Sequence, residues 1–114
     1  MAKQLRYRLC GKSGRYPAWL DQVRRKSGAY VIRDRTTHAT LYVGESHTGR
    51  LGKTITRHFQ AWTGKTAGDT FRRGRVEVAV LVCPPASAVA CQTRLIRRLR
   101  PPGNQYGTGE EAPF

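Results

Sequence analysis

The chain has 114 residues, a length that predicts one domain able to bury a core without disulfides as staples. No apolar run approaches the roughly 18 residues of a membrane span, and the first residues lack the apolar segment of a secretory signal. Its 21 lysines and arginines against 7 acidic residues give a formal net charge of +14. We therefore expect an intracellular, cytoplasmic protein without a membrane segment.

The charge favours a nucleic acid as the partner. Arginine outnumbers lysine by 16 to 5, and its planar fork binds phosphate oxygens two at a time. A solvated basic surface with no partner is one alternative. An anionic membrane surface is another, but no long segment pairs the charge with a broad apolar face.

The three cysteines are an odd number without C-x-x-C spacing, which argues against a disulfide framework and against a cysteine-built metal site. Any metal is therefore expected to be a hard cation held by oxygen ligands.

Residues 1–26 are interpreted as a basic arm followed by a short helix. The first 15 residues alternate basic with apolar or aromatic side chains, which predicts an extended arm or a short edge strand. Pro17 at a first helical position, followed by apolar residues, predicts a helix to about Lys26.

Residues 28–32 and 41–44 are rich in β-branched and aromatic residues and flank a polar turn, the pattern of a β-hairpin. A turn centred on Thr36 would place Tyr30 directly opposite Tyr42, on one side of the sheet. Taken alone, the two tyrosines are better explained as an aromatic pair that packs the core; the residues that follow reverse this preference.

Helical spacing begins at Arg50 and continues to about Trp62. Arg50, Thr54 and His58 share one face of this helix, beside its apolar stripe; a solvated flank is the alternative for that row. The apolar stripe consists of Leu51, Ile55, Phe59 and Trp62.

A basic, glycine-containing loop follows over 63–75 and is a candidate for DNA contacts. Next come a buried central strand over 76–83 and a second helix over 86–99. Gln92 falls within the apolar face of that helix, so it has either buried partners or a place in a functional pocket. A flexible tail is expected over 106–114. The candidate DNA contacts are Lys53, Lys65, Arg72 and Arg73.

Five elements in this order resemble the GIY-YIG nuclease domain. They are Gly28-Ala29-Tyr30, Tyr42-Val43-Gly44 after eleven intervening residues, a helix carrying arginine and histidine, the pair Leu95-Ile96, and Asn104 after Pro101. The resemblance covers about Ser27 to Asn104. It implies a small α/β (α+β) domain over 27–105, with a central three-stranded antiparallel sheet flanked by helices.

The resemblance also implies hydrolysis of DNA phosphodiester bonds with one Mg²⁺ or Mn²⁺ per site. Tyr30 would act as general base, directly or by relay, and Tyr42 would share that role or orient the water. Asn104 would support the site, and a glutamate from the last helix would hold the metal. An unperturbed tyrosine has a pKa near 10, so the metal and arginines would have to lower it.

The chain departs from the family pattern at the arginine. Counting back four residues from His58, which would activate the tyrosine or contact the phosphate, gives Thr54 where the family has arginine. We assign the guanidinium to Arg50, one turn earlier, with Arg57 as the alternative.

The graver departure is Gln92, which stands where the family has its metal-binding glutamate. An amide oxygen is a poor ligand for a hard divalent ion. Either a substitution was introduced to trap an uncleaved complex, or this is a natural DNA-binding module that does not cut. The first is preferred because most other site residues are retained. Cutting both strands with one site per chain would favour a homodimer or two sequential nicks. A basic RNA-binding protein is a third reading.

Overall fold

The fold is described from a computed structural model, which places residues 5–11, 15–59, 71 and 73–100. The 3₁₀ turns cover Arg57–Phe59 and Arg73–Arg75. The helices and strands, in chain order, are β1 (Tyr7–Leu9), α1 (Ala18–Gln22), β2 (Gly28–Asp34), β3 (Thr40–Ser46), α2 (Leu51–Thr56), β4 (Val76–Val82) and α3 (Pro85–Leu99).

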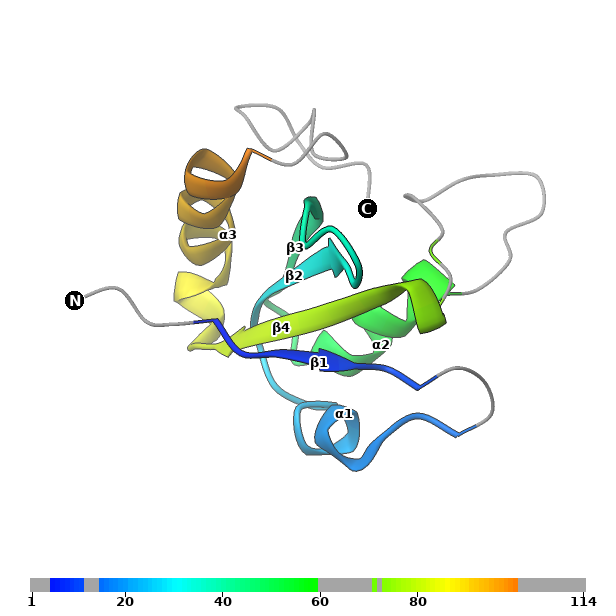
Figure 1. The fold of residues 1–114 in the computed structure, drawn as a ribbon. Coiled ribbons are helices and arrows are strands. Elements are labelled where there is room, and N and C mark those ends of the chain that lie inside the picture. Colours follow the sequence, from blue (N-terminus) through cyan, green and yellow to red (C-terminus); the bar gives the residue numbers. More distant parts are fainter. Residues whose placement is uncertain (1–4, 12–14, 60–70, 72, 101–114) are drawn as a thin grey trace, which may run out of the picture.

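The strands form one antiparallel sheet in the order β1-β4-β2-β3, so the domain is a small α+β fold (Figure 1). The three-stranded sheet that the resemblance implies is present as β4-β2-β3, and a fourth strand at its edge confirms the short edge strand expected as one alternative for the first 15 residues. The N-terminal segment adds β1, which pairs with β4 from Tyr7 opposite Ala79 to Leu9 opposite Glu77. Three residues are too few for a periodic pattern to distinguish a strand from an extended arm.

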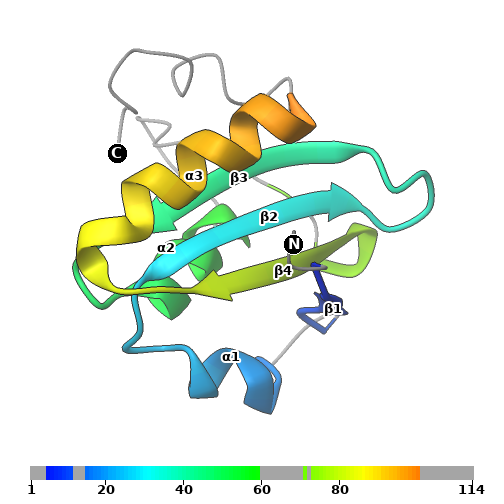
Figure 2. The same cartoon turned by 90° about the vertical axis from the view of Figure 1, so that its left-hand side faces the viewer.

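Helices cover both faces of the sheet. Figure 2 shows α3 and α2 on opposite sides of β2. Successive strand residues point to opposite faces. Ala29 and Val31 accordingly belong to the core cluster under α3, whereas Tyr30 and Ile32 belong to the cluster shared with α1 and α2. In the described part of the chain, no helix has both the length and the apolar character to cross a membrane.

The hairpin has a different register from the expected one. Tyr30 lies opposite Gly44 and Tyr42 lies opposite Ile32, so the expectation that the tyrosines pair directly was wrong. They still share one face, as diagonal neighbours. The hairpin is centred on Thr37 rather than on Thr36. The Asp34 carboxylate stabilises this turn, because it accepts hydrogen bonds from the backbone amides of Thr36 and Thr37. A register shift between Ile32 and Arg33 also separates the turn from the rest of the ladder.

Both N-terminal helices are shorter than expected. α1 ends at Gln22 rather than near Lys26, and α2 gives way to a 3₁₀ turn after Thr56. The end of α2 contains three consecutive β-branched residues, which favour helix weakly. Two of them, Thr54 and Thr56, donate their hydroxyls to the carbonyls of Arg50 and Lys53. α3 agrees closely with expectation: it begins on Pro85 and ends before Arg100, whose φ is 48°.

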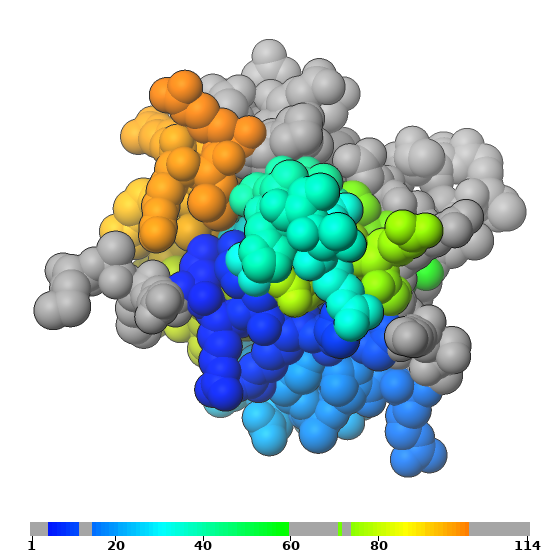
Figure 3. All heavy atoms as spheres, in the orientation of Figure 1, coloured from blue at the N-terminus to red at the C-terminus, as the bar shows by residue number. Residues whose placement is uncertain are grey.

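A partly buried ion pair joins three strands. Arg33 of β2 donates from Nε to Oε1 of Glu77 on β4 at 2.6 Å. The same guanidinium lies 3.6 Å from the centre of the Tyr7 ring on β1, within cation–π range. In the space-filling view the N-terminal segment, in blue, packs against the hairpin, in cyan (Figure 3). The arginine therefore stabilises the attachment of β1 to the sheet.

We expect Glu77→Gln to lower the free energy of unfolding by about 1–2 kcal/mol, because it removes a charged partner from a partly buried guanidinium. The control is Asp21→Asn at an exposed carboxylate that forms no ion pair with any described residue. That change should stay within about 0.5 kcal/mol. Urea unfolding measures both, and equal stability of the two variants would contradict the role given to Glu77.

Candidate functional site

A hydrogen bond between two buried side chains forms the centre of the site. The Tyr30 hydroxyl lies 2.7 Å from Nε2 of His58. Tyr30 comes from β2 and is 0% exposed, and His58 comes from the 3₁₀ turn after α2 and is 3% exposed. Buried polar groups need partners, and here each supplies one for the other.

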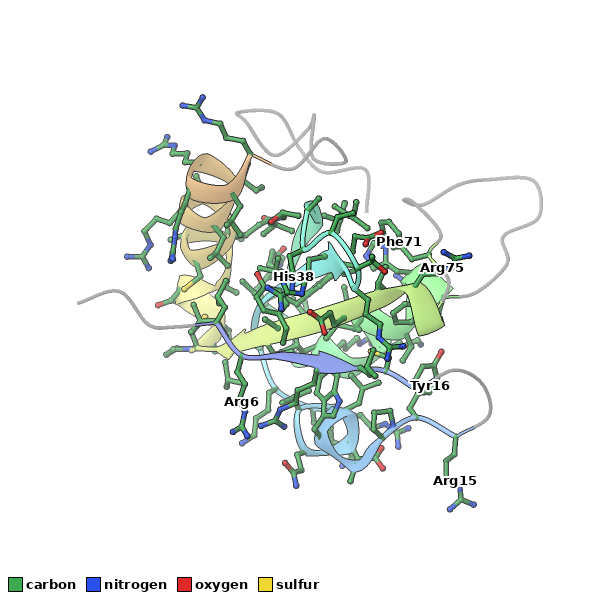
Figure 4. All side chains as sticks on the ribbon, viewed as in Figure 1. Arg6, Arg15, Tyr16, His38, Phe71 and Arg75 are labelled. Atoms are coloured by element: carbon green, nitrogen blue, oxygen red, sulfur yellow. The ribbon has the colours of Figure 1, made fainter. Side chains whose placement is uncertain are left out.

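Aromatic rings surround this pair. The centre of the His58 ring lies 4.6 Å from that of Tyr42 and 5.8 Å from that of Phe71. The rings of Tyr30 and Tyr42 are 6.2 Å apart. These separations are typical of packed aromatic pairs. Figure 4 shows Phe71 near the end of α2, where its backbone amide donates to the carbonyl of His58.

Gly44 makes room for Tyr30. A Cβ atom at position 44 would lie 2.3 Å from the Tyr30 hydroxyl oxygen and 2.3 Å from its Cζ. The tyrosine ring therefore crosses β3 directly over the glycine. Together, the register that sets Tyr30 opposite Gly44 and the missing side chain allow the hydroxyl to reach His58.

Burial raises the pKa of Tyr30 well above its ordinary value of 10.0. The nearby Tyr42 and Glu45 raise this pKa further, whereas the Arg57 guanidinium lowers it. Burial dominates, so Tyr30 is protonated at neutral pH. Its hydroxyl donates to Nε2 of His58 or accepts from it, according to the tautomer of the imidazole.

The structure brings together three of the expected site residues, Tyr30, Tyr42 and His58. Arg57 follows α2 directly, and its charge acts on Tyr30. Arg50 is exposed at the N-cap of α2 and lines a groove between α1 and α2, together with Lys53. The two candidate arginines therefore belong to different parts of the surface.

Gln92 lies on α3, which covers the face of the sheet opposite Tyr30. Its side chain is half-buried beside Cys91 and forms no hydrogen bond with any described residue. Among the placed residues, no group of three or more histidine, cysteine, aspartate or glutamate side chains could hold a metal ion. A neutral amide without a neighbouring carboxylate set does not fit Mg²⁺ or Mn²⁺.

Several expected contacts fall outside the described residues, namely Lys65, Arg72 and Asn104. The backbone of Arg73 belongs to the 3₁₀ turn before β4, but its side chain is outside the description.

Glu45 and Phe71 were not anticipated as neighbours of the site. Glu45 acts on the pKa of Tyr30 although strand alternation points the two to opposite faces. Its place directly after Gly44 was the available signal. Phe71 shares no predicted helix or strand with His58, so nothing in the sequence placed its ring beside that histidine.

Comparison of the sequence with protein-family models gives no match, and neither does comparison with curated proteins.

We expect the stability of the protein to depend on Tyr30 at high pH. An unfolded chain releases the Tyr30 proton near its ordinary pKa of 10.0, whereas the folded chain retains it. The resulting stabilisation is complete below that value and is lost as the pH rises toward the higher folded pKa. Tyr30→Phe lacks this proton, so above pH 10 its free energy of unfolding should fall less steeply, by up to about 1.4 kcal/mol per pH unit.

Urea unfolding of both proteins across this pH range measures the difference. Every other titrating group is common to the two, so parallel curves would contradict the raised pKa.

Proposed function

We propose that this chain is a DNA-binding domain of the GIY-YIG nuclease type, a metal-dependent DNA endonuclease whose hydrolytic step is impaired here by Gln92. One observation carries the proposal, the 2.7 Å hydrogen bond between Tyr30 and His58 in the centre of a strongly cationic domain. Burying two polar rings costs free energy unless they form a hydrogen bond with each other. A core that serves packing alone would therefore gain little stability from this pair.

DNA binding follows from the charge. A net charge of +14 on 114 residues attracts a polyanion and releases its counterions on binding. Exposed arginines among the placed residues offer forked donors for phosphate oxygens.

The Tyr30–His58 pair supports a proton relay. A water attacking phosphorus would give its proton to the Tyr30 oxygen, and the Tyr30 proton would move to Nε2 of His58. The pKa of Tyr30 is raised, which is opposite to the lowering expected of a direct general base, so Tyr30 would act only as a relay that passes its own proton to His58. Arg57, whose charge lowers the pKa of Tyr30, would stabilise negative charge on the phosphate.

A DNA-binding module that does not cleave is the second candidate. Two observations favour it. Gln92 offers no charged ligand, and Tyr30, at 0% exposure, meets no solvent water in this arrangement. In that case the Tyr30–His58 pair would only hold α2 against the hairpin.

The test is cleavage of single-stranded and duplex DNA with Mg²⁺ or Mn²⁺ by the chain as given and by Gln92→Glu. The endonuclease proposal requires cleavage only after the substitution, because a carboxylate is a charged oxygen ligand and an amide is not. The position of residue 92 on the face of the sheet opposite Tyr30 counts against that outcome. Adding Tyr30→Phe to Gln92→Glu should then lower the rate by about 10²- to 10⁴-fold.

Binding of DNA is measured in parallel. If neither protein cuts DNA while both bind it, the non-cleaving module is the correct function. If neither binds DNA, both candidate functions are wrong.

A further inference from the structure

A basic groove lies between α2 and the segment that contains α1, away from the residues that surround Tyr30. Its volume is about 620 Å³. The residues that matter for its chemistry are Tyr16, Leu20, Arg24, Arg25, Arg50 and Lys53. We call it the α1–α2 groove.

Four cations line the α1–α2 groove, and all four side chains are exposed. None of them forms an ion pair with an acidic side chain in the described part of the chain. One carboxylate, that of Asp21, shares the lining. The groove therefore carries a clear excess of positive charge, and an anion entering it would not have to displace an internal partner.

The backbone fixes the two sides of the groove against each other. The amide of Leu51 donates to the carbonyl of Lys26 at 3.1 Å, and that of Gly52 donates to the carbonyl of Arg24 at 3.4 Å. A Cβ atom at position 52 would lie 2.8 Å from the Cα of Arg24, so the missing side chain permits this approach. Arg24 and Arg25 are thus held beside Arg50 and Lys53 before any ligand binds.

The lining also includes apolar surface. Leu20 is buried in the core, and Tyr16 packs its ring 6.4 Å from that of Phe59. Figure 4 shows Tyr16 on the chain leading into α1. Rings and aliphatic side chains offer sugars and bases a surface that a site for a free inorganic anion does not need.

The groove and the Tyr30–His58 site share one element. Arg50 precedes α2 and His58 follows it, eight residues later. At about 1.5–2 Å per residue this is roughly 12–16 Å, a length over which one strand of a duplex carries about four phosphates. A strand that reaches His58 along α2 would therefore meet the groove.

We propose that the α1–α2 groove binds the phosphodiester backbone of a DNA strand. Arg50 acts there, with Arg24, Arg25 and Lys53, rather than on Tyr30. This inference rests on the proposed function, because it assumes that DNA is the ligand. It adds the location of the bound strand on the protein surface. The spread of four cations over two chain segments fits several successive phosphates better than one small anion.

The test compares two variants of equal charge. Arg24→Gln/Arg25→Gln removes two cations from the groove, and Arg97→Gln/Arg98→Gln removes two exposed cations from α3 on the other side of the sheet. Fluorescence anisotropy with a labelled oligonucleotide, single-stranded and duplex, gives Kd at salt concentrations from about 50 to 200 mM. We expect the groove variant to bind about 10-fold more weakly and to lose about two units of salt slope. The α3 variant should change less than about 3-fold.

Asp21→Asn provides a change of opposite sign, since removing the one carboxylate should tighten binding about 2- to 3-fold. Amide hydrogen exchange of the unaltered protein locates the strand without any substitution. Binding should protect amides over 18–26 and 49–56.

Equal weakening by the two charge-matched variants, without protection of these amides, would mean that binding is diffuse; the groove assignment would then be wrong and the proposed function would stand. Displacement of the oligonucleotide by micromolar triphosphate at matched ionic strength would show that the groove binds a free polyphosphate. The proposal that it binds a DNA strand would then be wrong. Failure of the unaltered protein to bind DNA would overturn both proposals.

Discussion

The requirement that a buried hydroxyl have a partner organises this domain. Tyr30 lies in the middle of β2, and its ring can reach His58 only by crossing β3 at a residue without a side chain. The hydrogen bond therefore depends on the hairpin register, on Gly44 and on the point where α2 ends. Because one interaction needs all three, a change at any of them leaves a buried polar atom unsatisfied.

Much of this architecture could be read from the sequence. Runs of β-branched, aromatic and aliphatic residues predicted the hairpin and β4, and the two prolines before Ala86 marked the end of β4 ahead of α3. The shared face of Tyr30 and Tyr42 followed from the hairpin pattern. Their register did not, because it depends on side-chain hydrogen bonds in the turn and on a local shift in the ladder. Spacing of four residues predicted that Arg50 and His58 share one helical face. α2 has only six residues, however, so Arg50 lies at its N-cap and His58 lies beyond its last residue.

The charges around Tyr30 and those in the α1–α2 groove differ in their surroundings. Around Tyr30, burial keeps the tyrosine neutral and charge acts from the edges, through Glu45 and Arg57. In the α1–α2 groove, by contrast, the charged side chains are exposed. α2 connects the two regions, with Gly52 near its start for close packing and His58 just after its end. Its shortness brings the two regions close together.

The edge strand β1 affects how the protein meets other copies of itself. A sheet edge presents unpaired backbone groups, and long apolar edges recruit further strands from other molecules. β1 has only three residues, and arginines lie at and beside it. Few hydrogen-bonding groups remain at this edge, and any approaching copy meets like charge. The same segment that completes the sheet also protects this side of the protein from aggregation.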